Sequence, residues 1–234
     1  MPKPTIRTSG RHDLILEQLL DAAETLFARQ GVAGTSLSEL AEAVGLTRTG
    51  VYHYVKGKDE LLEHLVRGFT METAERLTEL AAQADRPAAD RLREGVASMA
   101  RRIAEHPRRF RLLVTSEDAF PEPIAKQHRA ARRSTLDAMI SLVDQAKAEG
   151  GTRPVDTRLT AFALLGATNW MAFWYRPDQV GDLTPQQAAD ALAAIALDGV
   201  LSERAEGADS LQGALDLLRE DVDRLSLFVD RTPD

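Results

Sequence analysis

Residues 35–58 read TSLSELAEAVGLTRTGVYHYVKGK, and this stretch decides the fold of the N-terminal part of the chain. Ser36 and Glu39 have the spacing of a capping box, in which a serine caps a helix and a glutamate three residues later reaches back to it. The helix is expected to end at Gly45, because glycine readily adopts the left-handed backbone that often follows helices. Thr47 is placed to cap a second, short helix.

A helix, a glycine turn and a short second helix form the layout of a DNA-binding helix-turn-helix, whose second helix enters the major groove. The exposed face of that helix should therefore be polar or aromatic. An ordinary helical hairpin is the alternative, and Tyr52 as a core residue and His53 as an unremarkable surface residue stay open. The candidate groove-facing residues are Arg48, Thr49, Gly50, Tyr52, His53 and Tyr54.

The run from Leu19 to Leu62 resembles the TetR family of bacterial transcriptional regulators. The matching residues read AAETLFARQGVAGTS and then LSELAEAVGLTRTGVYHYVKGKDELL. Two positions differ from the usual family pattern: Val55 stands where many members have phenylalanine, and Gly57 replaces the usual serine or asparagine cap. We therefore expect a weaker cap on the helix that follows.

The resemblance implies roles for individual side chains on DNA. Arg48 would read a base, because a guanidinium matches guanine O6 and N7 through two hydrogen bonds. Thr49, Gly50 and His53 would touch base edges or thymine methyl groups. The residues implied to contact phosphates are Thr47, Tyr52, Tyr54 and Lys58, with Thr35 or Ser36 in support.

Apolar residues recur with helical spacing along the rest of the chain, and strand-like alternation is nearly absent. Short polar or proline-containing breaks separate the segments, which predicts an all-α fold of antiparallel helices. We expect a flexible arm (1–10), a three-helix helix-turn-helix head (11–58) and a larger helical body for ligand binding and dimerisation (59–234). The expected helices run from about Ile15 to Gly31 and over 37–44, 47–54, 58–84, 88–105, 108–117, 122–149, 156–175, 185–202 and 209–229.

Composition narrows the functional classes. Lys and Arg number 29 against 36 Asp and Glu, a net charge of −7 that argues against nonspecific coating of nucleic acid. Residues 1–58 are nearly balanced in charge, which permits a local DNA contact. No cysteine is present, the five histidines are scattered, and no catalytic motif is found, so we expect neither an enzyme nor a metal or other cofactor.

Two segments show whether the chain carries a signal peptide or a membrane span. Residues 1–10 are polar and include two prolines, which is unlike a signal peptide. The most apolar stretch, 159–175, is interrupted by Asn169 and is shorter than the roughly 18 apolar residues of a membrane span. We therefore expect a cytoplasmic protein without a membrane partner.

The resemblance implies a homodimer formed by the helices 156–175 and 185–202. The second of these contains Ala188 and Gly199, and such small residues allow close approach of two helices. The alternative is that both helices belong only to the core of one subunit. A dimer fits DNA recognition, because two heads can read half-sites about 34–36 Å apart.

The body also contains an aromatic segment, LGATNWMAFWYRP, that ends at Pro177. Asn169 is a polar group in this apolar run, a combination typical of ligand pockets. The segment resembles TetR-type regulators of fatty-acid and steroid catabolism, some of which bind acyl-CoA thioesters. The alternative is that the tryptophans only pack a dimer core. The candidate cavity walls are Met99, Ile103, Phe110, Leu113, Phe120, Met139, Val143, Asn169, Trp170 and Trp174.

Two arginine clusters in the body have two readings. Arginine binds phosphate through a fork of donors, so the clusters could hold the phosphates of coenzyme A. The alternative is a solvated surface paired with carboxylates. The clusters are Arg101, Arg102, Arg108, Arg109 and Arg111, followed by Arg129, Arg132 and Arg133.

Taken together, the resemblance implies a repressor that leaves its double-stranded operator when a small hydrophobic effector, such as an acyl-CoA, binds the body. The rival interpretation is a ligand-binding or adaptor protein without a role in DNA regulation. The intact Arg48, Tyr52 and Lys58 argue against that rival.

Overall fold

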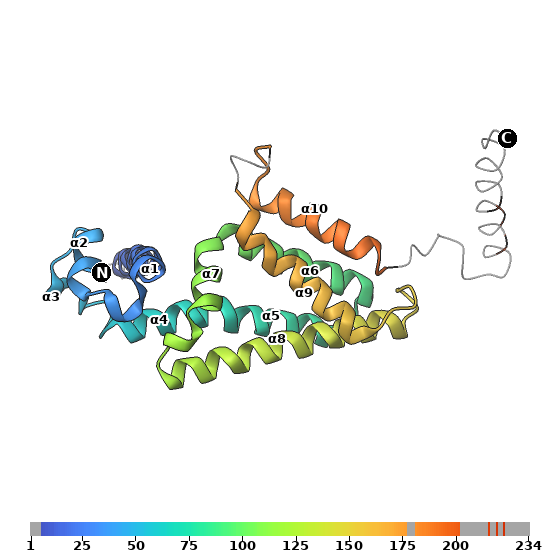
Figure 1. The fold of residues 1–234 in the computed structure, drawn as a ribbon, viewed down its shortest axis with the longest axis horizontal. Coiled ribbons are helices and arrows are strands. Elements are labelled where there is room, and N and C mark those ends of the chain that lie inside the picture. Colours follow the sequence, from blue (N-terminus) through green and yellow to red (C-terminus); the bar gives the residue numbers. More distant parts are fainter. Residues whose placement is uncertain (1–5, 177–180, 202–214, 216–218, 220–221, 223–234) are drawn as a thin grey trace, which may run out of the picture.

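Helices joined by short turns make up the described part of the chain, as the sequence predicts (Figure 1). The computed structural model describes residues 6–176 and 181–201 together with 215, 219 and 222. The predicted tail helix 209–229 lies outside the described residues except at those last three positions. The helices are α1 (Ile6–Gly34), α2 (Leu37–Ala43), α3 (Arg48–Val51), α4 (Lys58–Val66), α5 (Glu72–Ala82), α6 (Ala88–Glu105), α7 (Pro107–Thr115), α8 (Glu122–Ala148), α9 (Thr157–Trp174) and α10 (Pro185–Asp198).

Several predicted boundaries differ from the structure, including the end of α10 at Asp198 rather than at 202. Helix α1 begins at Ile6, so residues 6–10 are helical rather than part of an arm. Helix α3 ends at Val51, and a turn replaces the predicted last part of the recognition helix. The long fourth helix contains a π-helical turn, η1 (Arg67–Met71), between α4 and α5. A π-turn inserts one residue into the helical register and often marks a functional site.

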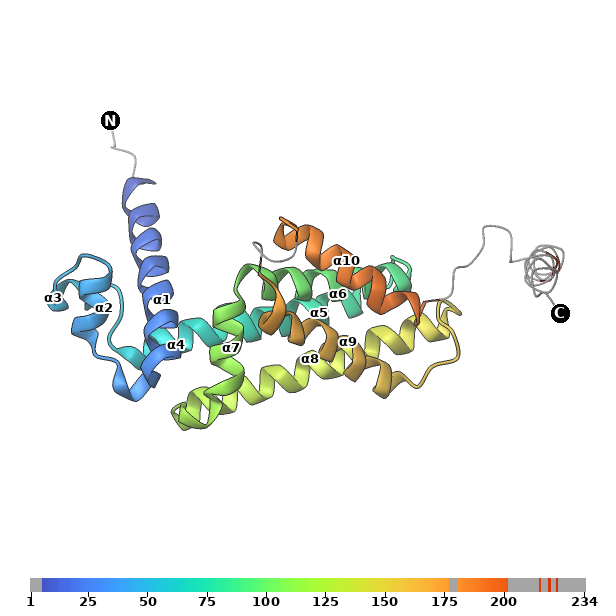
Figure 2. The same cartoon turned by 45° about the horizontal axis from the view of Figure 1, so that its top comes forward.

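The helices form a small head at one end of an elongated body (Figures 1 and 2). Helices α1, α2 and α3 make the head, and α4 runs from it through η1 into α5. Helix α8 lies along α5, while α6, α9 and α10 form the other side of the body. Helix α7 packs on both α1 and α9, so the head contacts the body at a second point.

The head and the nearest part of the body share one hydrophobic core. Leu61, Leu62, Leu65 and Val66 of α4 are fully buried in it. Head residues such as Leu19 and body residues of α7 and α9 belong to the same cluster. A second cluster fills the far part of the body between α5, α6, α8, α9 and α10. No flexible linker therefore separates head and body, as the sequence predicts.

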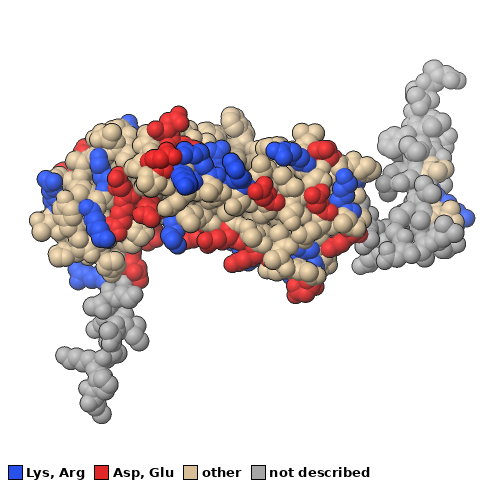
Figure 3. Space-filling model, turned by 90° about the horizontal axis from the view of Figure 1, so that it is seen from below, with Lys and Arg blue, Asp and Glu red and all other residues tan. Residues whose placement is uncertain are grey.

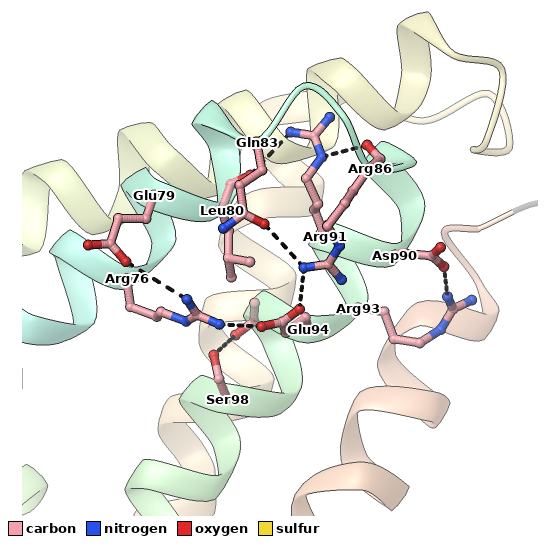
Figure 4. A network of polar contacts seen from close by, with 11 residues as sticks. Arg76, Glu79, Leu80, Gln83, Arg86, Asp90, Arg91, Arg93, Glu94 and Ser98 are labelled. Carbon is pink, nitrogen blue, oxygen red and sulfur yellow. Dashed lines mark hydrogen bonds and ion pairs between the residues drawn. The ribbon is translucent and has the colours of Figure 1, made fainter.

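A buried arginine fixes the turn between α5 and α6 (Figure 4). Arg91 is 2% exposed and donates to the backbone carbonyls of Leu80 and Arg86 at 3.2 and 3.0 Å. Beside it, Glu94 accepts hydrogen bonds from Arg86, at 2.8 Å, and from Arg76. The Arg86 hydrogen bond is the main cause that lowers the pKa of Glu94. The Arg91 side chain thus ties the end of α5 to the loop that precedes α6.

Candidate functional site: the helix-turn-helix and the cavity below it

The capping box expected at the start of α2 is present. Ser36 Oγ accepts from the backbone N–H of Glu39 at 3.2 Å, and the Glu39 carboxylate accepts from the Ser36 N–H at 2.8 Å. Gln30 of α1 donates to the same carboxylate at 3.0 Å. These hydrogen bonds, that of Gln30 first, lower the pKa of Glu39 to about 2. They fix the start of α2 against the end of α1.

The turn between α2 and α3 also forms as the sequence predicts. Gly45 has φ 69°, a left-handed conformation that disfavours other residues. Thr47 caps α3 by accepting from the backbone N–H of Gly50 at 3.0 Å. Val51 and Val55 are buried and anchor the far side of α3 in the core. The opposite side of α3 is consequently held outward.

Most of the residues expected to read DNA lie on this outward side. Arg48, Thr49, Tyr52 and His53 are exposed, and Tyr52, at 49% exposure, is not a core residue. Tyr54 is half-buried, with its ring centroid 5.0 Å from that of His12 in α1. In Figure 3 the head, on the left, shows separate basic side chains with acidic ones close by. The exposed surface suits a few positioned contacts rather than a broad basic patch.

Gly50 faces the turn rather than open solvent. A Cβ added at this position would lie 3.3 Å from Thr47 Oγ1 and 3.7 Å from Leu46 Cβ. The absence of a side chain therefore allows the turn to pack tightly against the start of α3. Any contact of this residue with DNA would have to come from its backbone.

Two predicted phosphate contacts have partners inside the head instead. Thr35 is buried, and its hydroxyl donates to the Gly31 carbonyl at 2.9 Å. The Lys58 ammonium donates to the carbonyls of Val32 and Ala33 at 2.7 and 3.3 Å. A cation on the free carbonyls of a helix C-terminus is favoured by the helix dipole. Both side chains thus stabilise the end of α1, and the buried Thr35 side chain has no path to a phosphate.

The weak cap expected at Gly57 is confirmed. This residue provides no side-chain hydrogen bond to the first turn of α4. The Glu60 carboxylate instead reaches back and accepts from the backbone N–H of Lys56 at 2.5 Å. The carboxylate in the first helical turn also interacts favourably with the helix dipole.

A cavity of about 800 Å³ lies in the body where η1, α6, α7, α8 and α9 meet. Its wall is mostly apolar, with several aromatic side chains and a few polar groups. Asn169 lines it and forms no hydrogen bond with any described residue. The predicted wall residues that the structure brings together are Met99, Ile103, Phe110, Leu113, Asn169 and Trp170.

Four predicted wall residues lie elsewhere. Met139 and Val143 are fully buried in the far core, because their positions on α8 face α5 and α6. Phe120 is buried with its ring 5.8 Å from that of His128, behind the cavity wall. Trp174 is 38% exposed and packs edge-on against Tyr175. The prediction that these four residues line the cavity is therefore wrong.

Other wall residues were not predicted. Phe162, Gly166 and Phe173 follow one face of α9 together with Trp170, so the helical spacing of the aromatic segment could have identified them. Phe69 and Thr70 come from the π-turn, which has no evident sequence signal. The remaining unpredicted polar wall residues are Thr73, Glu117, His128 and Thr135, whereas Arg102, Arg129, Arg132 and Arg133 come from the two arginine clusters that the sequence analysis considered for phosphate binding.

The arginine clusters are largely paired, as in the solvated alternative. Arg102 contacts Glu72 at 2.7 Å, and Arg132 contacts Glu117 at 2.5 Å. Arg129 pairs with Glu122, and Arg109 with Glu24. Arg111 donates to the Ala172 carbonyl at the end of α9, and Arg101 pairs loosely with Glu105. Arg133 at the cavity has no carboxylate within ion-pair distance among the described residues.

The Arg109–Glu24 pair joins α7 of the body to α1 of the head. Arg109 Nε donates to Glu24 Oε2 at 3.2 Å, and both side chains are buried. Burial raises the pKa of Glu24, and Arg109 acts in the opposite direction. A paired charge at this depth is costly to separate, so it holds head and body together.

The π-turn lies between the cavity and the head. Phe69 and Thr70 of η1 line the cavity, and α4 continues directly from η1 to the DNA-facing turn. Arg102 fixes the turn by donating to the Gly68 carbonyl, with its guanidinium 5.4 Å from the centre of the Phe69 ring. A molecule in the cavity would therefore touch the helix that positions the head.

Within the described ranges, no group of three His, Cys, Asp or Glu side chains could hold a metal ion. The same ranges include no helix with the length and hydropathy of a membrane span.

Comparison with known proteins identifies the family. Residues 19–65 match the family described as bacterial regulatory proteins, tetR family, and residues 85–200 match a tetracyclin repressor-like C-terminal domain. The transcriptional repressor KstR2 of Rhodococcus jostii is 28% identical over 210 residues, spanning 86% of this chain and 98% of that protein. KstR2 of Mycobacterium tuberculosis is 26% identical over 204 residues, spanning 84% and 98%.

Solved structures agree with this fold. The ketosteroid transcriptional regulator KstR2 of Mycobacterium tuberculosis superposes with a TM-score of 0.69 at 24% identity, covering 80% of this chain and 95% of that one. AibR in complex with isovaleryl coenzyme A and operator DNA gives 0.61 at 24% identity, covering 77% and 97%. The two family matches cover most of the head and body, and neither is to an enzyme family. The chain therefore belongs to the TetR family and is a helix-turn-helix DNA-binding transcriptional regulator.

Proposed function

We propose that this protein is a homodimeric repressor that leaves its operator when a hydrophobic effector enters the cavity. The observation that supports this best is the continuous path from cavity to head: the π-turn forms part of the cavity wall, and α4 leads from it to α3. We take 11–58 as the DNA-binding domain and 59–234 as the ligand-binding and dimerisation domain, with the boundary at the first turn of α4.

The proposed DNA interface is the outward side of the helix-turn-helix. Arg48 is the base reader, since its exposed guanidinium can match guanine in two hydrogen bonds. Thr49 and His53 are exposed beside it for further base-edge contacts, and Gly50 contributes backbone only. Phosphate contacts are assigned to the helix ends and the aromatic hydroxyls, namely Ser36, Thr47, Tyr52 and Tyr54. Ser36 and Thr47 are exposed at the N-terminal ends of α2 and α3, Tyr52 is exposed just after α3, and Tyr54 is half-buried.

The proposed dimer face is the outward side of α9 and α10. Leu159 and Trp170 of α9 are 70% and 64% exposed, and Ile195 of α10 is 75% exposed. The inward sides of both helices pack in the core, so the helices serve one subunit and still present an apolar surface. An apolar patch of this kind commonly marks a protein interface. A second copy placed there would also cover Phe162 and Trp170, which line the cavity.

An acyl-CoA is the proposed effector. The cavity offers aromatic walls for an acyl or ring system, and Arg133 at its edge has a guanidinium available for phosphate. AibR was solved with isovaleryl coenzyme A and operator DNA, and KstR2 is described as a ketosteroid regulator. These likenesses support a hydrophobic thioester as the first class to test.

Release follows from linkage between the two sites. An effector that binds better to a dimer whose heads no longer match the operator lowers DNA affinity by the same factor by which DNA lowers effector affinity. Helix α4 continues directly into η1, and the Arg109–Glu24 pair joins α7 to α1. A displacement of η1 or α7 would therefore move the head as well.

The test begins by selecting an operator from genomic fragments with the purified full chain. Titration of the complex with acyl-CoA esters, free coenzyme A and the matching free acids should identify an ester that weakens operator binding by about 5- to 150-fold. Arg133→Ala should reduce the response to that ester, whereas Arg93→Ala, an exposed arginine of α6 outside the cavity, should not.

Two results would contradict the proposal in different ways. Selective operator binding that no thioester changes would refute the acyl-CoA effector while preserving the repressor. Failure to select any genomic fragment, combined with thioester binding, would favour the ligand-binding or adaptor alternative.

A further inference from the structure

One wall of the cavity contains a buried imidazole with an unsatisfied nitrogen. His128 of α8 is 1% exposed, and its Nδ1 lies 3.1 Å from the Thr70 hydroxyl of the π-turn. Its Nε2 is buried and has no hydrogen-bond partner among the described residues. A buried donor without a partner destabilises the protein, so a ligand group that accepts a hydrogen bond from it is bound more tightly.

The nearest carboxylate does not satisfy this nitrogen. Glu117 Oε2 lies 3.7 Å from His128 Nε2, which is beyond hydrogen-bond distance. The same carboxylate is already engaged by Arg132 at 2.5 Å, with Arg129 at 3.9 Å. Glu117 therefore has strong partners of its own in the two arginines.

The surroundings of the imidazole favour Nε2 as the donor nitrogen. Burial lowers the pKa of His128, with Glu117 acting in the opposite direction, so the imidazole is neutral near neutral pH. A neutral imidazole has one N–H and one acceptor nitrogen. The Glu117 carboxylate, 3.7 Å from Nε2, favours the tautomer with the proton on Nε2, and the Thr70 hydroxyl can then donate to Nδ1. In the cavity wall this imidazole lies among aromatic side chains such as Phe69 and Phe110.

We propose that His128 Nε2–H recognises an oxygen acceptor, such as a ring or chain carbonyl, on the apolar part of the effector. This inference rests on the cavity being the effector site, and it adds a requirement on the effector's chemistry. Sites with a buried donor reject analogues that lack the matching acceptor. Because the same imidazole contacts Thr70, the recognised oxygen would be one hydrogen-bonded residue away from the π-turn.

The experiment uses two small probes that differ by one oxygen, 1-tetralone and tetralin. Their dissociation constants for the full-length protein are measured from the quenching of tryptophan fluorescence, since Trp170 lines the cavity. The quantity of interest is the ratio of the two constants in each variant. In His128→Asn the side-chain amide lies near the position of Nδ1, where it can still contact Thr70, and no donor remains at the position of Nε2. In His128→Gln the longer side chain places an amide N–H near the position of Nε2. His106→Asn, at an exposed histidine outside the cavity, is the matched control.

The preference for 1-tetralone over tetralin should be about tenfold larger in the wild type and in His128→Gln than in His128→Asn. A factor of about ten in affinity is what one hydrogen bond contributes. The control should match the wild type. In addition, the ¹⁵N resonance of His128 Nε2 should shift with 1-tetralone and not with tetralin.

Equal ratios in the wild type and His128→Asn would overturn this inference and leave the cavity as the effector site. If the wild type bound neither probe up to the solubility limit of 1-tetralone, both this inference and the proposed effector site would fail.

Discussion

The ammonium of Lys58 closes the C-terminal end of α1, and its replacement separates a structural role from a phosphate contact. Its Nζ lies 2.7 Å from the Val32 carbonyl and 3.3 Å from the Ala33 carbonyl. Lys58→Met keeps the aliphatic part of the side chain and removes both charged hydrogen bonds. The carbonyl of Val32, a buried residue, would lose its charged partner, whereas that of the exposed Ala33 can turn to water.

The expected cost is about 2 kcal/mol, because hydrogen bonds to a charged group contribute about 1.5–3 kcal/mol and one of the two carbonyls can be rehydrated. For a chain of this length the loss corresponds to a decrease of about 5 °C in Tm. Since the ammonium is engaged within the head, the salt dependence of operator binding should change little.

Thermal and urea unfolding, together with operator binding across several salt concentrations, measure both quantities. Lys56→Met is the control, because Lys56 is exposed in the same loop. Its stability should remain within about 0.5 kcal/mol of the wild type. A Lys58→Met protein as stable as the wild type, with a salt slope lower by about one, would refute the structural role and restore the phosphate contact.

Three further predictions concern the body. Arg91→Leu removes a buried guanidinium that donates to the Leu80 and Arg86 carbonyls, and it should lower the free energy of unfolding by about 3 kcal/mol in urea; an unchanged urea midpoint would contradict this. Leu159→Asp combined with Ile195→Asp should yield monomers in sedimentation velocity, whereas a persistent dimer would place the interface elsewhere. Burial lowers the pKa of His128 in the folded protein. As the pH decreases, this histidine is therefore protonated in the unfolded chain before it is protonated in the folded one, and the free energy of unfolding should decrease below about pH 6.5. His128→Gln should flatten that pH dependence, and an identical profile would exclude His128 as its source.

The head could be predicted because its determinants are local in sequence. The capping box, the left-handed Gly45 and the Thr47 cap each act over three or four residues, and all three are present. The outward side of α3 follows from them, since burying Val51 and Val55 leaves Arg48 exposed.

The role of Lys58 could not be predicted from the local sequence. Its partners are carbonyls 26 and 25 residues earlier in the chain, and they meet it only after α1 and α4 have packed. The sequence shows a basic residue at a helix start, where a phosphate contact is equally reasonable. The choice between the two depends on tertiary geometry.

The cavity could be predicted only in part for a related reason. Spacing identifies a residue as apolar and inward, but it does not distinguish a packed core from a cavity wall. Met139 and Leu136 lie on the same helix, yet the first is buried in the core and the second lines the cavity. The π-turn depends on long-range contacts, including those of Arg102 with Gly68 and of Thr70 with His128. The polar contacts at the π-turn were therefore not accessible from the local pattern, although Asn169 was.

Sequence reading by α3 is tested most directly by one ratio: the affinity for a selected operator divided by that for a scrambled duplex of equal length at one salt concentration. We predict a ratio of at least about 10³ for the wild type. Arg48→Ala should reduce it roughly tenfold by relaxing one base position. A wild-type ratio near one, or an unchanged ratio in Arg48→Ala, would contradict the assignment of this helix as the reader.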